Sequence, residues 1–175
     1  MTRIIKNPEW KYFDSQLSIN FPWYTRPFLE VLINNFELSN WKVFEYGGGN
    51  STIWWRRSSR EVHSVDTNPI WSKNMNLTLC QEKEKFISCP KNLINEEKFD
   101  CIIIDGEPVE WRDDCTQYAL ESIKIGGILI IDNYEQDSVG LKEWPKTNSL
   151  LSLHEKHVFK EPEHQDWKTA FWLIK

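Results

Sequence analysis

The amino-acid sequence predicts an α/β fold built on a mostly parallel β-sheet, and two patterns carry this prediction. Between Val43 and Asp66, a strand-like segment is followed by three glycines, a helical segment and a second strand that ends in an acid. Two later apolar runs, 99–106 and 126–133, also end in polar residues. Continuous apolar runs of this kind are typical of central parallel strands, which are buried on both faces.

In the first half of the chain, strands alternate with helices. A proline in the first turn and an apolar stripe with helical spacing favour a helix before the first strand. The expected elements are a helix starting at Thr25-Arg26-Pro27, a strand at 43–46, a helix capped by Asn50, Ser51 or Thr52 and running to about 58, a strand at 62–65, and a helix from Asn68-Pro69 to about 79.

In the second half, the expected elements are a short third strand at 85–89, a polar link at 90–98, a buried strand at 99–106, a helix at 112–123, a strand at 126–133, a long loop at 138–148, and strands at about 156–159 and 169–174. Two strands after the last crossover predict an antiparallel hairpin at one edge of the sheet.

Acidic residues stand at the ends of four predicted strands, at Glu45, Asp66, Asp105 and Asp132. In open α/β sheets, ligands bind outside the carboxyl ends of the strands, so these acids are expected to line one crevice. Asp66 follows Gly47 by 19 residues. That spacing is close to the one at which an acid accepts hydrogen bonds from ribose hydroxyls, which predicts a ribose-bearing cofactor.

Charge selects among such cofactors. Glu45 lies two residues before Gly47 and is expected to face the occupant of the loop, where it would repel a pyrophosphate. S-adenosylmethionine carries an ammonium and a sulfonium instead, and the amides of the loop Gly47, Gly48 and Gly49 would receive its carboxylate. Thr52 replaces the third glycine of the dinucleotide fingerprint. An NAD-like dinucleotide, or a glycine turn without a ligand, remains the alternative.

Composition predicts one domain over 1–175, with an N-terminal helical segment (1–40), a cofactor-binding core (41–135) and a C-terminal hairpin region (136–175). The sequence has no run of about 18 apolar residues and its start lacks a signal-peptide core, so a cytoplasmic protein without a membrane partner is expected. A net charge of −5 disfavours a nucleic-acid partner and favours a small-molecule substrate. The four cysteines are expected to be reduced thiols.

The sequence resembles the class I S-adenosylmethionine-dependent methyltransferases, in particular small members with a Glu-Tyr-Gly-x-Gly-Asn-Ser-Thr loop. The resemblance rests on Pro22-Trp23, 45–52, 64–66, 104–106, 112–115 and 126–133. It implies a Rossmann-like three-layer α/β/α sandwich with a seven-stranded sheet and a reversed last strand. It also implies that Glu45 and the loop through Asn50, Ser51 and Thr52 hold the methionine portion, Asp66 the ribose, and the region near Ser88 and Cys89 the adenine.

Methyl transfer is an in-line displacement that needs alignment of the acceptor and removal of a proton. Asp105 and Asp132 are the expected catalytic residues; alternatively, they cap the next helix and a turn. Together with Asn133, these acids stand in positions similar to the metal triad of catechol-type O-methyltransferases. Those enzymes place a lysine just after the first acid, whereas this chain has Glu107, so no metal is assigned.

Aromatic residues complete the expected site. Trp23 and Trp111 lie in loops beside the crevice and, with Glu107 and Asn133, are the expected substrate contacts. Trp54, Trp55 and Trp71 fall on predicted helices and are expected to pack against the sheet.

The sequence therefore predicts a methyltransferase that uses S-adenosyl-L-methionine and methylates a small molecule at oxygen. The alternative is a non-catalytic Rossmann-like subunit that binds S-adenosylmethionine or a nucleotide. A homodimer that closes the site is compatible with the sequence.

Overall fold

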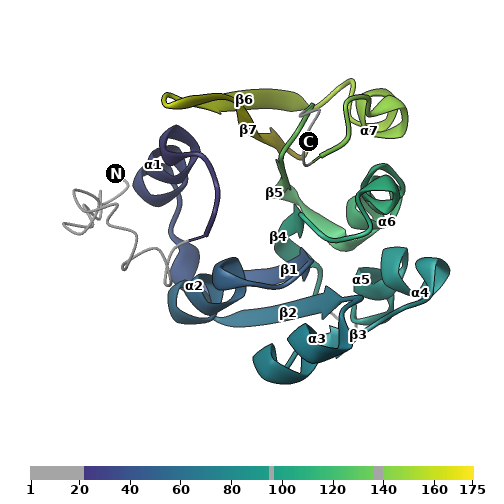
Figure 1. Cartoon of the computed structure of the whole chain (residues 1–175). Coiled ribbons are helices and arrows are strands. Elements are labelled where there is room, and N and C mark those ends of the chain that lie inside the picture. Colours follow the sequence, from purple (N-terminus) through teal and green to yellow (C-terminus); the bar gives the residue numbers. More distant parts are fainter. Residues whose placement is uncertain (1–21, 95–96, 136–139) are drawn as a thin grey trace.

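A computed structural model describes residues 22–94, 97–135 and 140–175 (Figure 1). Its helices are α1 (Arg26–Asn35), α2 (Asn50–Ser58), α3 (Pro69–Met75), α4 (Lys83–Ile87), α5 (Cys89–Asn92), α6 (Arg112–Ser122) and α7 (Pro145–Leu150), with short 3-10 helices η3 (Leu38–Asn40) and η4 (Val109–Trp111). Its strands are β1 (Lys42–Tyr46), β2 (Glu61–Asp66), β3 (Thr78–Leu79), β4 (Phe99–Ile104), β5 (Ile123–Asp132), β6 (Glu155–Glu161) and β7 (His164–Leu173). Parts of the expected N-terminal segment (1–21), polar link (95–96) and long loop (138–139) lie outside the described residues.

The seven strands form one sheet in the order β3-β2-β1-β4-β5-β7-β6. The first five strands in this order run parallel to their neighbours, whereas β7 pairs antiparallel with both β5 and β6. The mostly parallel seven-stranded sheet with an antiparallel C-terminal edge hairpin is therefore confirmed. The carboxyl ends of β1, β2, β4 and β5 meet at one edge of this sheet.

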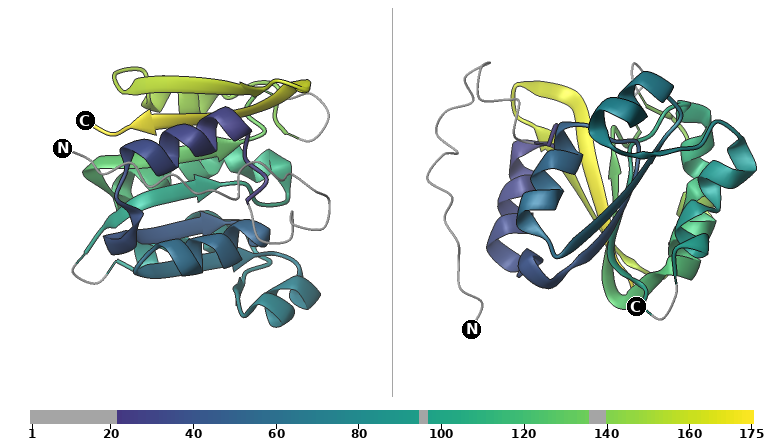
Figure 2. Two further views of the ribbon diagram at one scale, coloured as in Figure 1. Left: turned by 90° about the vertical axis from the view of Figure 1, so that its left-hand side faces the viewer. Right: turned by 90° about the horizontal axis from the view of Figure 1, so that it is seen from below.

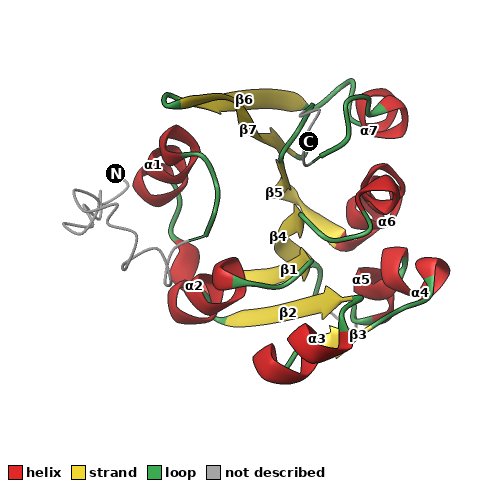
Figure 3. Cartoon of the chain, viewed as in Figure 1, coloured by secondary structure: helices red, strands yellow, loops and turns green. Residues whose placement is uncertain are grey.

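Helices cover both faces of the sheet, so the predicted three-layer arrangement is confirmed. Helices α1 and α2 lie on one face, and α6 and α7 lie on the other (Figures 2 and 3). Among the described residues, no helix combines the length and the apolar character needed to cross a lipid bilayer.

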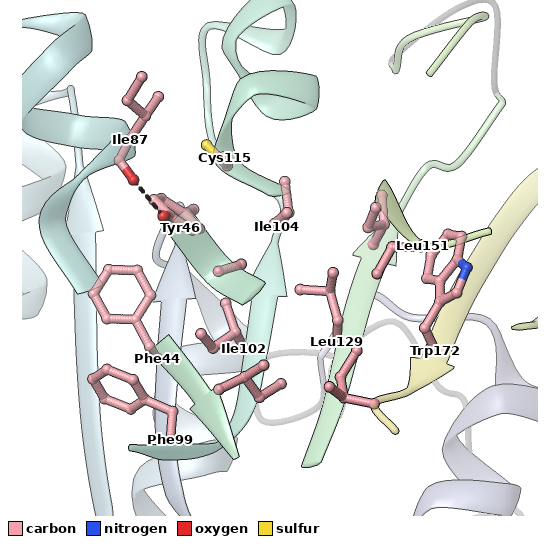
Figure 4. Close-up of a cluster of buried hydrophobic side chains, with 14 of the residues drawn as sticks. Phe44, Tyr46, Ile87, Phe99, Ile102, Ile104, Cys115, Leu129, Leu151 and Trp172 are labelled. Atoms are coloured by element: carbon pink, nitrogen blue, oxygen red, sulfur yellow. Dashed lines mark hydrogen bonds between the residues drawn. The ribbon is translucent and has the colours of Figure 1, made fainter. Parts of the chain in front are cut away.

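The central strands are apolar on both faces because each face packs against a helical layer. Along β4, Cys101 and Ile103 join the core under α1 and α2, whereas Ile102 and Ile104 join the core under α6. Figure 4 shows the second core, in which the Tyr46 hydroxyl donates a hydrogen bond to the Ile87 carbonyl oxygen at 2.6 Å. The continuous apolar runs in the sequence correspond to this burial on two sides.

A partner distant in the sequence caps the N-terminus of α1. The carboxylate of Glu161, at the end of β6, accepts hydrogen bonds from the Arg26 backbone N–H at 2.9 Å and from the Arg26 Nε at 2.6 Å. The expected start of this helix at Thr25-Arg26-Pro27 is confirmed. The Thr25 side chain does not cap it.

Three expected elements differ from the structure. The third strand is not at 85–89: it is β3, and the residues expected to form it lie in α4 and at the start of α5. Phe86 is buried there, with its ring centroid 5.4 Å from that of Tyr46, so tertiary packing overrides the strand propensity of this segment. Helix α3 ends at Met75, because Asn76 adopts a left-handed conformation with φ of 52°. The expected loop at 138–148 contains the start of α7.

Candidate functional site

A pocket of about 290 Å³ lies where the carboxyl ends of β1, β2 and β4 meet. Small-molecule sites commonly measure about 300–1,000 Å³, so this pocket is at the lower end of the size of such sites. It is lined by Trp23, Gly47, Gly48, Gly49, Asn50, Ser51, Asp66, Trp71, Asp105 and Glu107. The structure thus brings together most of the expected cofactor residues with two expected substrate residues, Trp23 and Glu107.

The glycine loop fits closely against the end of β4. Gly47 has a φ of 83°, and a Cβ added to it would overlap the Cα of Gly106 and lie 2.7 Å from its nitrogen. Only glycine combines this conformation with so close an approach of two backbones. The loop is therefore shaped by packing against Gly106.

The amides of this loop are already bonded within the protein. The Gly47 N–H donates to the Val65 carbonyl oxygen at 2.8 Å, the Gly48 N–H to the Asp66 carboxylate at 3.1 Å, and the Gly49 N–H to the Thr52 hydroxyl at 2.9 Å. In this arrangement the three glycine N–H groups have partners within the protein, and the expectation that the loop amides receive the carboxylate of a cofactor stays a prediction. The loop contributes shape to the pocket, and the N–H groups of its three glycines are hydrogen-bonded within the protein.

Glu45 lies beneath the loop and is 1% exposed, so it does not face the pocket as expected. Its carboxylate accepts hydrogen bonds from the hydroxyls of Ser51 and Thr52, and from that of Ser64 at 2.8 Å. Burial raises the pKa of Glu45 to about 7, although these three hydroxyls lower it. Glu45 joins the end of β1 to the first turn of α2 and to β2. The charge of the pocket therefore has to come from other residues.

Asp66 and Trp71 form the β2 side of the pocket. The Asp66 carboxylate accepts hydrogen bonds from the backbone N–H groups of Gly48 and Asn68, the latter at 2.7 Å, and the Asn68 side chain in turn caps α3. The Trp71 indole N–H donates to the Gly48 carbonyl oxygen. Trp71 is 40% exposed and lines the pocket, so the expectation that it packs against the sheet is wrong. Trp71 lies in the first turn of α3, directly after the Asn68-Pro69 cap. This position next to the end of β2 was the sequence feature that could have placed it in the pocket.

Asp105 and Glu107 form the opposite side. Although 30% of the Asp105 side chain is exposed, desolvation raises the pKa of Asp105 to about 6, while the Arg112 guanidinium lowers it and Glu107 raises it. Glu107 is largely exposed, and its carboxylate accepts a hydrogen bond from the Val109 N–H at 3.0 Å. The Thr67 hydroxyl donates to the Glu107 carbonyl oxygen at 3.0 Å, which ties this loop to the end of β2.

Asp132 does not line the pocket. It is 3% exposed, and its carboxylate accepts a hydrogen bond from the Thr169 hydroxyl at 2.6 Å. The same hydroxyl accepts a hydrogen bond from the Thr25 backbone N–H at 2.9 Å. Burial, followed by the charge of Asp105, raises the pKa of Asp132 well above its usual range. Asp132 therefore ties β5 to β7 and to the segment that leads into α1.

Two expected substrate residues also lie outside the pocket lining. Trp111 packs against the core beside Phe86, with ring centroids 5.7 Å apart. Asn133 has a φ of 54° in the turn after β5. Within the parts of the chain that the structure describes, no group of three or more histidine, cysteine, aspartate or glutamate side chains is arranged to hold a metal ion.

Replacing Thr169 by valine should lower the free energy of unfolding by about 2–4 kcal/mol. Valine has the same shape but lacks the hydroxyl, so it leaves both the Thr25 N–H and the Asp132 carboxylate short of a partner in a buried place. Serine keeps the hydroxyl and removes only a methyl group, which costs about 1 kcal/mol. Urea denaturation of both variants tests this: a valine variant as stable as the serine variant would show that this link contributes nothing.

Comparison with known proteins identifies similar folds. Neither the models of protein families nor the sequences of curated proteins match this chain. Among solved structures, an O-methyltransferase from Bacillus cereus in complex with S-adenosylhomocysteine (SAH) superposes with a TM-score of 0.58 at 16% identity, over 75% of this chain and 73% of that chain.

Two further structures give similar values. The O-methyltransferase TomG from Streptomyces achromogenes, involved in tomaymycin synthesis and bound to S-adenosylmethionine (SAM), has a TM-score of 0.55 at 12% identity, over 77% of this chain and 73% of that chain. An rRNA methylase from Streptococcus thermophilus has a TM-score of 0.53 at 10% identity, over 79% of this chain and 90% of that chain. The chain therefore has the fold that these methyltransferases share, with a glycine-lined pocket at the carboxyl ends of its parallel strands.

Proposed function

We propose that this protein is a methyltransferase that uses SAM and methylates a small molecule at oxygen. The observation that carries the proposal is the pocket itself. It places the glycine loop, which follows β1, between Asp66 at the end of β2 and Asp105 at the end of β4, the parallel strands on either side of β1. Two solved structures with this fold are complexes with SAM or SAH.

The lining suits this cofactor because it is rich in hydrogen-bond acceptors and negative charge. Its ionisable residues are Asp66, Asp105 and Glu107, and no lysine, arginine or histidine is among the lining residues that the structure describes. Each carboxylate oxygen of Asp66 accepts one backbone N–H and retains a lone pair for a ribose hydroxyl. A pyrophosphate would be repelled by the same three acids. This argument replaces the one based on Glu45, which is buried.

Bound SAM would supply an electrophilic methyl group, and the residues of this chain would bind and align the acceptor. Asp105 is the acid positioned for this role, because it lines the pocket with part of its side chain exposed. With a pKa of about 6, Asp105 is mostly ionised at pH 7. Its carboxylate would then accept a hydrogen bond from the hydroxyl group of the substrate that is methylated. Asp132 supports the site through Thr169 and has no direct contact with the pocket.

A small molecule is the proposed acceptor because the charge around the pocket opposes RNA. The rRNA methylase shares the fold, but this chain has a net charge of −5 and only acids among the ionisable lining residues. An RNA backbone needs a basic surface beside the site. The similarity to two O-methyltransferases favours oxygen as the methylated atom.

Thermal unfolding with and without ligand tests the cofactor. SAM or SAH at about a hundredfold over its dissociation constant should stabilise the protein by about 2.7 kcal/mol, because it binds only the folded state. This corresponds to a rise in Tm of roughly 5–10 °C at this chain length. NAD and UDP-glucose serve as controls. A shift with a control and none with SAM or SAH would refute the proposal.

Turnover separates the enzyme from the alternative of a non-catalytic binding subunit. A panel of phenols, sugars and amines is incubated with SAM, and formation of SAH is measured. SAH formed with a hydroxyl compound supports the proposal. Binding of SAM without turnover of any compound in the panel favours the binding subunit.

A further inference from the structure

Arg112, the first residue of α6, is 3% exposed and directs its guanidinium beneath the ends of two strands. Its Nε donates to the Gly106 carbonyl oxygen at 2.7 Å, and its Nη2 to the Asp105 carbonyl oxygen at 2.9 Å. Its Nη1 donates to the Asp132 carbonyl oxygen at 3.2 Å. One side chain thus bonds the carboxyl ends of β4 and β5.

The same guanidinium also faces two acids of the pocket. Nη2 lies 3.3 Å from a carboxylate oxygen of Asp105 and 3.7 Å from one of Glu107. Burying a cation costs free energy unless it is paired and hydrogen-bonded, and a cation in the first turn of a helix is opposed by the helix dipole. The arrangement therefore does not stabilise α6 itself. Its hydrogen bonds hold together the ends of β4 and β5.

Arginine suits this role because its planar group carries five N–H donors in a fixed fork, whereas a lysine ammonium is a single point charge. The bonded carbonyls belong to the backbone that shapes the pocket. Gly106 packs against Gly47 of the glycine loop, and the Asp105 N–H donates to the Tyr46 carbonyl oxygen at 3.0 Å. Movement of the Asp105-Gly106 backbone would displace both the Asp105 carboxylate and the loop.

We propose that Arg112 is a positioning residue that joins the ends of β4 and β5 and holds the Asp105 carboxylate in the pocket. This inference rests on the proposed function, in which Asp105 contacts the ligand. Other charged or titratable groups around Asp105 come from each neighbouring element. They are Glu45 on β1, Asp132 on β5, Glu107 in the following loop and Tyr24 before α1.

The test compares Arg112→Gln and Arg112→Lys with the wild type in two measurements. The first is the titration of Asp105 in the free protein, followed by carboxyl carbon NMR. Glutamine removes the charge that lowers the pKa of Asp105, so the midpoint should rise by about one unit or more. Lysine keeps the charge and should leave the midpoint nearer to that of the wild type.

The second measurement is the affinity for SAH by calorimetry between pH 5 and 8. At pH 7 both variants should bind at least tenfold more weakly, because neither side chain has the planar fork of donors that spans the three carbonyls. In Arg112→Gln the loss of affinity on acidification should begin at higher pH. Arg60→Gln, which removes a surface arginine paired with Glu97, is the control and should bind like the wild type.

The outcomes separate the inference from the proposed function. A wild type that binds neither SAM nor SAH refutes the function, and the NMR titration then still tests the link to Asp105. A wild type that binds SAH, together with an Arg112→Gln variant that binds within twofold and has the same Asp105 midpoint, refutes the inference alone. If Arg112→Gln does not fold, the affinity of Arg112→Lys decides: binding equal to the wild type overturns the inference.

Discussion

Replacing Gly47 by alanine is expected to destabilise the protein by about 2–5 kcal/mol and to weaken SAM binding at least tenfold. The left-handed conformation costs a residue with a Cβ about 1–2 kcal/mol, and overpacking adds about 1–3 kcal/mol. The new Cβ would meet backbone atoms of Asp105 and Gly106, which cannot rotate away as a side chain would. The glycine loop and Asp105 both line the pocket. The added Cβ would push them apart, so the affinity for SAM, measured by calorimetry, should also fall.

Gly126 provides a matched control for this change. Its φ of 82° is almost the same as that of Gly47, but a Cβ added to Gly126 meets no atom within 4 Å. Gly126→Ala should therefore lose only the conformational part, about 1–2 kcal/mol, and should bind SAM like the wild type. Equal losses of stability in the two variants, with binding retained in both, would contradict the role given to the contact between Gly47 and Gly106.

Replacing Glu45 by alanine is expected to lower the free energy of unfolding by about 3–5 kcal/mol. Ser51, Thr52 and Ser64 would lose the common acceptor of their hydroxyls in a place shielded from water. Glu45→Gln is the matched variant, since it keeps the shape and one acceptor oxygen, and it should lose about 1–2 kcal/mol. Chemical denaturation of both variants at pH 7 measures the difference. An alanine variant as stable as the glutamine variant would argue against the three-hydroxyl arrangement.

The pH dependence of the same pair tests the charge state of Glu45. Its pKa rises from 4.5 in the unfolded chain to about 7 in the folded protein, so the folded state retains a proton that the unfolded state releases. The resulting stability is fully present below pH 4.5 and is lost as the pH rises through 7. Glutamine does not titrate. The advantage of the wild type over Glu45→Gln should therefore shrink by about 2–3 kcal/mol between pH 5 and 8.

The opposite trend has an equally definite meaning. If the stability advantage of the wild type over Glu45→Gln grows with pH, the three hydroxyls stabilise the Glu45 carboxylate more than burial disfavours it. Glu97, Asp114 and Glu121 have lowered pKa values, so their contribution to stability grows with pH, which is the trend opposite to that of Glu45. They are unchanged in the variant, so comparison with Glu45→Gln removes their contribution.

The sequence predicted those parts of the fold that local pattern determines. The strands β4 and β5 were predicted because each contains a continuous apolar run, and β1 and β2 because they flank the glycine turn and its helix and end at a turn or an acid. The alternation of these strands with helices along the chain implied parallel pairing. The segment 85–89 was mispredicted because Phe86 and Ile87 are buried by contacts with distant residues, including Tyr46. An alternating strand and a short helix with two adjacent buried residues look alike over five residues.

In the candidate site, too, local pattern predicted some features, whereas others depend on tertiary packing. Spacing after the glycines placed Gly47 and Asp66 in one pocket, because both lie at the ends of neighbouring strands. The burial of Glu45 and Asp132 was not predicted, since it depends on hydroxyls whose positions follow from helix and sheet packing. Arg112 was missed as a functional residue because its strand-end partners include Asp132, 20 residues away. A fixed cation near Asp105 is a tertiary property, and spacing alone does not show it.

The hydrogen bonds that hold the segment after Trp23 to the last two strands have a consequence for synthesis on the ribosome. Trp23 precedes Thr25 and Arg26, whose backbone N–H groups are bound by Thr169 of β7 and Glu161 of β6. A nascent chain that has emerged only as far as β5 already has the glycine loop, Asp66 and Asp105, but not the anchors for the wall that carries Trp23. The wall of the pocket that carries Trp23 therefore gains these two anchors only after the C-terminal hairpin has left the exit tunnel.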